Sequence, residues 1–189
     1  GDPMQSKIND IRNKPIVVKA PGGEFSEVNF HKVKKVSDYL RQKKCFIKRK
    51  FILNDLSGYM KRNGHLPAIC FVFSRKHVEL CAGEISQSLF DEDSTVPITI
   101  EDECKKILIS KLANYKEYLH LPEYTTLISL LQKGVAIHHA GMLSVLREMV
   151  ELLFDKGYIK LLFATETFAV GINVPAKSTI FTSLEKFNG

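Results

Sequence analysis

Polar residues follow an apolar run near the end of the sequence, and their types suit phosphate binding. Lys160 to Ala164 is mostly apolar, as in a strand buried on both faces, and Thr165, Glu166, Gly171 and Asn173 follow within nine positions. Hydroxyl and backbone N–H groups at a strand end suit phosphate oxygens, and glycine permits close approach of a ligand. The segment therefore predicts contact with a phosphate-rich ligand. From spacing alone, a surface turn capped by Thr165 explains the pattern equally well.

Residues 171–178, GINVPAKS, differ from the P-loop pattern at one position, where Ala176 replaces the second glycine. A P-loop must also open a helix, whereas residues 178–182, STIFT, are β-branched and aromatic and predict a strand. Lys177 is therefore not interpreted as a lysine that binds a triphosphate.

Two more predicted strands end in polar residues. Ser74 and Arg75 follow the apolar run AICFVF, and His139 and Gly141 follow the strand predicted at 135–138. Arg75 could bind a phosphate through two nitrogens, although a surface arginine at the start of a helix is an equal alternative. Adjacent residues of a strand point to opposite sides, so His138 is interpreted as a core histidine and His139 as the ligand contact.

Strands alternate with helices along most of the chain, which predicts an α/β fold with a mainly parallel sheet. Parallel strands end at one edge of a sheet, so the three polar clusters should share a surface. The predicted strands are 15–20, 68–73, 135–138, 159–164 and 178–182. The predicted helices are 29–44, 76–89, 101–118, 122–132 and 144–156. One more helix is predicted between Asn54, as its N-cap, and Gly64, which would end it. Residues 91–97, with three acidic side chains and a proline, predict an exposed loop.

Basic residues are concentrated in one segment of the 189-residue chain. Residues 31–50 carry nine lysines and arginines against one aspartate, a local charge of +8 within a total of +6, which leaves −2 for the rest. Such a patch attracts nucleic acid through its phosphates. A solvated helix face remains the simpler explanation of a charge run.

The cysteines and the hydropathy exclude several classes. Cys45, Cys70, Cys81 and Cys104 include no C-x-x-C pair, so we expect reduced thiols and no zinc site. No apolar run approaches the roughly 18 residues that cross a membrane, and the polar N-terminus is not a signal peptide. We expect a soluble, intracellular protein without a membrane partner.

Four phrases within residues 67–189 form a distinctive set: CFVFSRK, GVAIHHAGMLSVLREMVELLF, LLFATETFAVGINVPA and FTSLEKFNG. Together they resemble the second RecA-like domain of superfamily two helicases, most closely the superkiller-type DExH-box RNA helicases. The resemblance implies a RecA-like three-layer sandwich, with a mainly parallel central sheet and helices on both faces. Residues 1–66 match only in general layout, and residues 4–66 are expected to form the N-terminal part of the domain with its basic helical segment.

The resemblance also implies roles for individual residues. Those placed along the RNA backbone are Ser74, Arg75, His139, Gly141, Thr165 and Glu166, and those placed at the nucleotide cleft are Gly171 and Asn173. The full-length enzyme would use ATP and Mg²⁺. Its partners would be single-stranded RNA, the first RecA-like domain of the same protein and RNA-decay machinery.

Several parts of a complete helicase do not occur in the sequence. A Walker A lysine, a DExH carboxylate pair and the arginine-rich motif VI are needed for phosphoryl transfer. We therefore expect an excised piece, truncated before motif VI, with residues 1–3 as a cloning remnant and with no catalytic residues or activity of its own. A non-motor RNA-binding scaffold and a DNA helicase domain are the alternatives.

Overall fold

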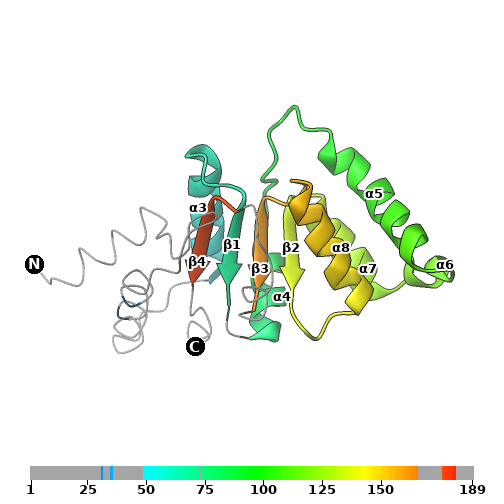
Figure 1. Ribbon diagram of the computed structural model, residues 1–189. Helices are drawn as coiled ribbons and strands as arrows, with labels where there is room; N and C mark the ends of the chain where they lie inside the picture. The colour runs from blue at the N-terminus through cyan, green and yellow to red at the C-terminus, as the bar shows by residue number, and fades with distance from the viewer. Residues whose placement is uncertain (1–30, 32–34, 36–48, 73, 166–175, 182–189) are drawn as a thin grey trace, which may run out of the picture.

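The computed structural model describes residues 49–72, 74–165 and 176–181, together with His31 and Lys35. Helices and strands alternate through most of this part of the chain (Figure 1). In order, they are α3 (Arg49–Arg62), β1 (Ala68–Phe71), α4 (Arg75–Glu84), α5 (Val96–Lys111), α6 (Tyr115–Tyr118), α7 (Pro122–Leu131), β2 (Val135–His138), α8 (Ser144–Asp155), β3 (Leu161–Ala164) and β4 (Ser178–Phe181).

The four described strands form one parallel sheet in the order β2-β3-β1-β4. Ala68 of β1 lies opposite Leu161 of β3 and Ser178 of β4, and Val135 of β2 also lies opposite Leu161. All four strands point the same way in Figure 1, so their carboxyl ends meet at one edge. The predicted α/β class is therefore confirmed.

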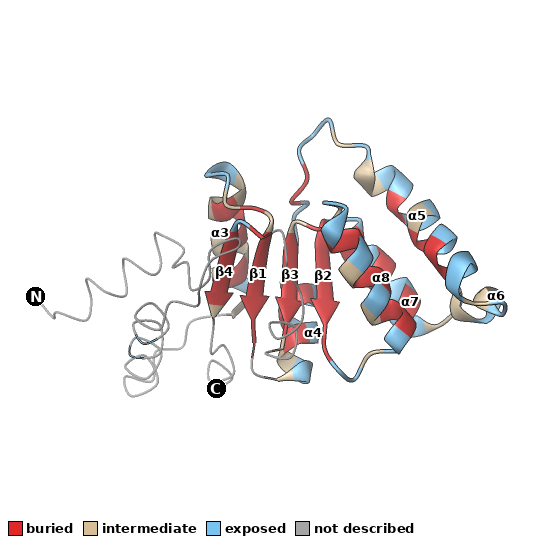
Figure 2. Ribbon diagram, in the orientation of Figure 1, coloured by how far each residue is buried: buried red, intermediate tan, exposed pale blue. Residues whose placement is uncertain are grey.

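Helices cover both faces of the sheet, and alternate strand residues point to different helices. Ala68 and Cys70 belong to the core cluster that includes α3 and α4. Ile69 and Phe71 belong to the cluster that includes α5, α7 and α8. Because both faces are covered, β1, β2 and β3 are buried along their whole length (Figure 2). This explains why these strands are continuous apolar runs rather than alternating ones.

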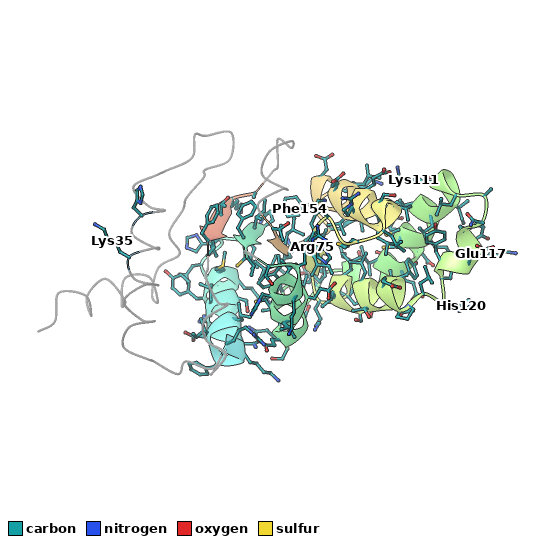
Figure 3. All side chains as sticks on the ribbon, turned by 90° about the horizontal axis from the view of Figure 1, so that it is seen from below. Lys35, Arg75, Lys111, Glu117, His120 and Phe154 are labelled. Atoms are coloured by element: carbon teal, nitrogen blue, oxygen red, sulfur yellow. The ribbon has the colours of Figure 1, made fainter. Side chains whose placement is uncertain are left out.

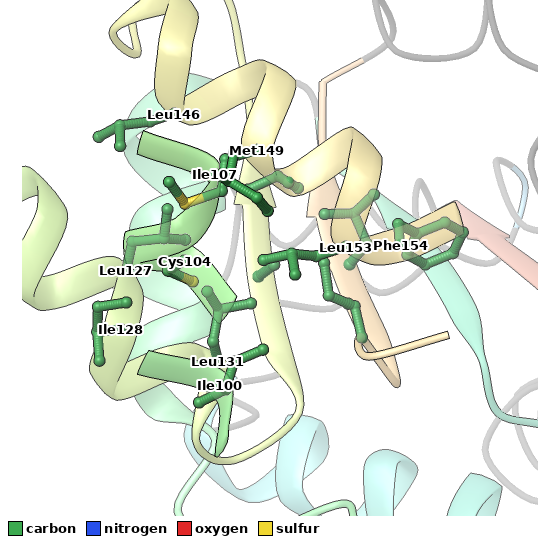
Figure 4. Packing of buried hydrophobic residues seen from close by; sticks show 14 of the residues in the cluster. Ile100, Cys104, Ile107, Leu127, Ile128, Leu131, Leu146, Met149, Leu153 and Phe154 are labelled. Carbon is green, nitrogen blue, oxygen red and sulfur yellow. The ribbon is translucent and has the colours of Figure 1, made fainter. Parts of the chain in front are cut away.

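In the larger core cluster, α7 and α8 both pack against β2, and α5 packs against both of these helices (Figure 4). Met149 and Leu153 of α8 are completely buried, as are Leu131 of α7 and Ile100 of α5. Full burial of a side chain of this size stabilises a fold by about 1.5 to 3 kcal/mol. The α8 helix is therefore anchored firmly, and with it the turn that joins β2 to its first residue, Ser144.

Asn54 does not cap a helix, and this prediction is wrong. The α3 helix is already formed from Arg49, and Asn54 lies in its second turn. Its amide Nδ2 donates to the carbonyl oxygen of Glu84, 2.7 Å away, and its Oδ1 accepts from the backbone N–H of Ser86, 2.9 Å away. Asn54 therefore forms hydrogen bonds with backbone groups at the carboxyl end of α4. A side chain that commonly caps a helix can instead bind backbone groups of another segment.

Several predicted boundaries also shift. The α4 helix ends at Glu84 instead of near residue 89, and the helix predicted at 101–118 is divided into α5 and α6. Pro97 lies in the first turn of α5, where a missing N–H costs nothing, rather than in the preceding loop.

Other predictions agree with the structure. The acidic residues Asp91, Glu92 and Asp93 are exposed, as predicted. Gly157, with a φ of 80°, follows α8 and ends it as expected.

The strand predicted at 15–20 and most of the helix predicted at 29–44 lie outside the described residues. His31 and Lys35 are helical and exposed.

Within the basic segment, Arg49 binds both carboxylate oxygens of Glu84, at 2.7 and 2.6 Å, so this guanidinium has a structural role. Hydrogen bonding to Glu84 raises the pKa of Arg49. None of the helices in the described ranges combines the length and apolar character needed to cross a membrane.

Candidate nucleic-acid interface

The three polar clusters meet at the carboxyl edge of the sheet. The N–H of Val72, just past β1, donates to the carbonyl oxygen of Ala164 at 2.8 Å, and that of Thr165, just past β3, donates to His138 at 3.2 Å. Backbone pairing therefore continues beyond the strands and fixes their ends side by side. Figure 3, which views the molecule from this edge, places Arg75 near the middle, with Lys35 at one side and Lys111 at the other.

Ser74 connects β1 to α4 as the N-cap of that helix. Its Oγ accepts a hydrogen bond from the backbone N–H of His77 at 3.2 Å and lies 2.9 Å from His77 Nδ1. A capping hydroxyl of this kind satisfies one of the N–H groups that a helix start leaves unpaired. Arg75, the first residue of α4, is exposed beside this cap. Ser74 therefore positions Arg75, and its hydroxyl already has a structural partner.

His139 is almost completely buried, with an exposed fraction of 4%. Its Nδ1 accepts a hydrogen bond from the backbone N–H of Gly141, and its Nε2 lies 3.0 Å from an oxygen of Glu79 on α4. Both ring nitrogens are thus engaged within the protein. The predicted direct contact between this ring and RNA remains a prediction, and the observed role is to connect α4 to the turn after β2.

Gly141 lies where a side chain would be crowded. A Cβ atom there would come within 3.1 Å of His139 Nδ1 and 3.4 Å of Arg75 Cδ. The turn after β2 consequently packs directly against the side chain at the start of α4. Two of the three predicted clusters are therefore in contact, and the third is joined to β2 through Thr165.

His138 points to the opposite side of the sheet, as predicted from its position beside His139. It is buried, and its Nε2 lies 2.9 Å from an oxygen of Glu151 on α8. Burial lowers the pKa of His138, while its hydrogen bond to Glu151 opposes that shift. The prediction of a core histidine is consistent with this environment.

Thr165 is half-buried at the end of β3. Glu166, Gly171 and Asn173 lie outside the described residues, so their predicted contacts with RNA and nucleotide stay predictions.

Within the described ranges, no group of three or more histidine, cysteine or acidic side chains is arranged to hold a metal ion. Cys70, Cys81 and Cys104 are buried free thiols, and burial raises the pKa of Cys81 to about 11.

Glu79 was missed by sequence reasoning, although a signal was available. It lies four residues after Arg75, and residues at this spacing share a face of a helix. The helix predicted at 76–89 follows Arg75 directly at the carboxyl edge and therefore also presents Glu79 near that edge. The pairing with His139 requires the tertiary arrangement of β1 and β2, which no local pattern contains.

The chain is similar over most of its length to known helicases, although no protein-family model matches it. It is 37% identical to the antiviral helicase SKI2 of Saccharomyces cerevisiae over 154 residues, which are 75% of this chain and 11% of that protein. It is 40% identical to the human exosome RNA helicase MTR4 over 135 residues, which are 69% of this chain and 12% of that protein. The chain is homologous to superkiller-type DExH-box RNA helicases.

A further relative, an uncharacterized helicase of Schizosaccharomyces pombe, is 33% identical over 172 residues, or 88% of this chain. That match covers 16% of the relative, so the chain spans a small part of the length of each of these helicases. The parallel sheet with helices on both faces is the RecA-like arrangement expected for superkiller-type helicases.

Proposed function

We propose that this chain is the second RecA-like domain of an ATP-dependent RNA helicase and that the carboxyl edge of its sheet contacts the RNA backbone. The observation that carries the proposal is the meeting of Ser74–Arg75, His139–Gly141 and Thr165 at that edge. A guanidinium, a capped helix start and a hydroxyl are suitable partners for phosphates and sugars. Contacts to the backbone alone suit a motor that steps along any sequence.

The whole enzyme would hydrolyse ATP with Mg²⁺ between this domain and a first RecA-like domain. Gly171 and Asn173 are proposed to face the nucleotide, with Glu166 beside the RNA. The name of human MTR4 describes that relative as an exosome RNA helicase, which supports RNA as the substrate proposed here. RNA-decay machinery is accordingly a proposed partner class for the full-length protein.

The decisive test measures ATP hydrolysis by the full-length protein with and without single-stranded RNA. We expect RNA to stimulate turnover, with single-stranded DNA of the same length as the comparison. Absence of stimulation by either nucleic acid would support a non-motor scaffold, and stimulation by DNA alone would support a DNA helicase. Both results would defeat the proposal.

A second test uses the 189-residue chain and examines the proposed surface directly. We expect weak binding to single-stranded RNA that falls as salt rises, because each phosphate contact releases counterions. Replacing Arg75 with alanine should weaken binding and reduce the slope of log affinity against log salt by about 0.7. Arg62, an exposed arginine at the end of α3, provides the control. An equal effect of Arg62→Ala would remove Arg75 from the proposed interface.

A further inference from the structure

A carboxylate on α4 is connected through a buried ring to the backbone of the turn after β2. Glu79 Oε1 lies 3.0 Å from His139 Nε2, and the N–H of Gly141 donates to His139 Nδ1 at 3.0 Å. A backbone N–H is always a donor, so Nδ1 must accept and cannot carry a proton. The proton of the neutral ring is therefore on Nε2, where it is donated to Glu79.

The α4 helix also contacts the turn after β2 through a second residue, Arg75. Arg75 Cδ lies 3.4 Å from the position of a Cβ on Gly141, and Arg75 and Glu79 are one helical turn apart on α4. The α4 helix thus borders the turn twice, by packing at Arg75 and by hydrogen bonding at Glu79. A shift of the ring would alter the path of the backbone beside Arg75.

Electrostatic attraction does not explain why Glu79 lies at the carboxyl edge of the sheet. Its side chain is 60% exposed and negative, and a carboxylate beside a phosphate-binding surface repels the ligand. If charge were its only effect, removing the carboxylate would strengthen RNA binding. A role in holding His139 predicts the opposite, so the sign of the change separates the two explanations.

We propose that Glu79 is a positioning residue for the RNA-contacting edge: by holding the His139 ring, it fixes the Gly141 amide and the turn beside Arg75. The inference rests on the proposed function, because it assumes that this edge contacts RNA. Glu79 touches neither RNA nor nucleotide in this role. It acts through His139, and its contribution is the placement of the turn.

The experiment follows hydrogen exchange of the Gly141 amide by NMR and affinity for single-stranded RNA, both in the 189-residue chain. Glu79→Ala should speed exchange of that amide and weaken RNA binding, each about three- to ten-fold, the range that a single hydrogen bond supports. Glu79→Gln keeps an oxygen that accepts from Nε2 and should stay within about two-fold of the wild type. Glu101→Ala, which removes an exposed carboxylate from α5, is the charge control.

Two variants of His139 separate the two hydrogen bonds. The side-chain oxygen of asparagine can replace Nδ1 as the acceptor for Gly141 but cannot reach Glu79, so Glu79→Ala should have no further effect in His139→Asn. The side-chain nitrogen of glutamine can replace Nε2 toward Glu79 but offers Gly141 no acceptor, so His139→Gln should lose amide protection even with Glu79 present. Thermal unfolding of each variant checks that the fold is retained.

Tighter RNA binding by Glu79→Ala, an unchanged Gly141 amide, or equal effects of Glu79→Ala and Glu79→Gln would each overturn the proposal. If the wild-type chain does not bind RNA, the proposed function of the edge fails. The exchange of the Gly141 amide would then still show whether Glu79 positions the turn.

Discussion

The backbone N–H of Thr165 donates a hydrogen bond to the carbonyl oxygen of His138, across a distance of 3.2 Å. His138 is the last paired residue of β2, and Thr165 directly follows Ala164, the last paired residue of β3. This backbone bond therefore helps to fix the position of Thr165 relative to the turn after β2.

Replacing Thr165 with alanine should consequently separate function from folding. The backbone bond to His138 persists, and we expect the free energy of unfolding to change by about 1 kcal/mol or less. RNA-stimulated ATP hydrolysis by the full-length protein should fall, because the hydroxyl proposed to contact the RNA backbone is lost. Turnover that is still fully coupled to RNA would exclude Thr165 from the interface.

Adding a methyl group at Gly141 should destabilise the protein and disturb the same edge. The new Cβ would lie 3.1 Å from His139 Nδ1, and the ring is held by Glu79 and cannot move away without losing that bond. We expect Gly141→Ala to lower the free energy of unfolding by about 1 to 3 kcal/mol, as measured by urea denaturation.

The matched control for Gly141 is Gly83→Ala on α4, where a Cβ would have open space around it. Alanine favours the helical state over glycine by about 1 kcal/mol, so this variant should be as stable as the wild type or more stable. If the two alanine variants lose equal stability, crowding by His139 is not the cause.

The buried His138 should make stability depend on pH. Because burial lowers its pKa in the folded state, the unfolded chain binds more protons below the ordinary histidine value of about 6.5. The stability contributed by neutral His138 is thus complete above about pH 6.5 and is lost as pH falls through the lowered folded value. Urea denaturation from about pH 7.5 to about pH 5 should show this loss.

His138→Gln cannot be protonated and retains a donor for Glu151, so it should remove the histidine part of that dependence. The difference in unfolding free energy between wild type and variant should shrink or reverse toward acid. Parallel curves for the two proteins across this range would show that His138 is not the titrating group.

Asn54 is partly buried in the second turn of α3, and its side chain should contribute to stability by bridging to α4. Replacing it with alanine removes the partners of the Glu84 carbonyl and the Ser86 N–H, and we expect a loss of about 1 to 3 kcal/mol. Asn63→Ala is the control, since the Asn63 side chain donates to the carbonyl oxygen of Tyr59, which lies in the same helix. Equal losses in urea denaturation would contradict the proposed bridge between α3 and α4.

Periodicity and turn residues predicted most of the fold within the described residues. The strands Val135–His138 and Ser178–Phe181 and the helix Ser144–Asp155 agree closely with prediction, because each is bounded by a local signal such as Gly157. The convergence of the three clusters also follows from one rule about parallel strands.

The remaining features depend on contacts between segments far apart in the sequence. Asn54 was assigned to the start of a helix, since its side chain commonly caps one, yet its partners are 30 and 32 residues away. Likewise, His139 was interpreted as a ligand contact, and its burial against Glu79 depends on how α4 crosses β2. Side-chain partners of this kind are set by tertiary packing and have no local signature.

The two bonds of Arg49 to Glu84 and the bridge through Asn54 fasten α3 to the carboxyl end of α4. These bonds would have to break before α3 could move independently of α4, and α4 begins at Arg75. A displacement of α3 would therefore shift the end of α4 that lies farthest from Arg75, which gives residues remote from the sheet edge a mechanical route to it.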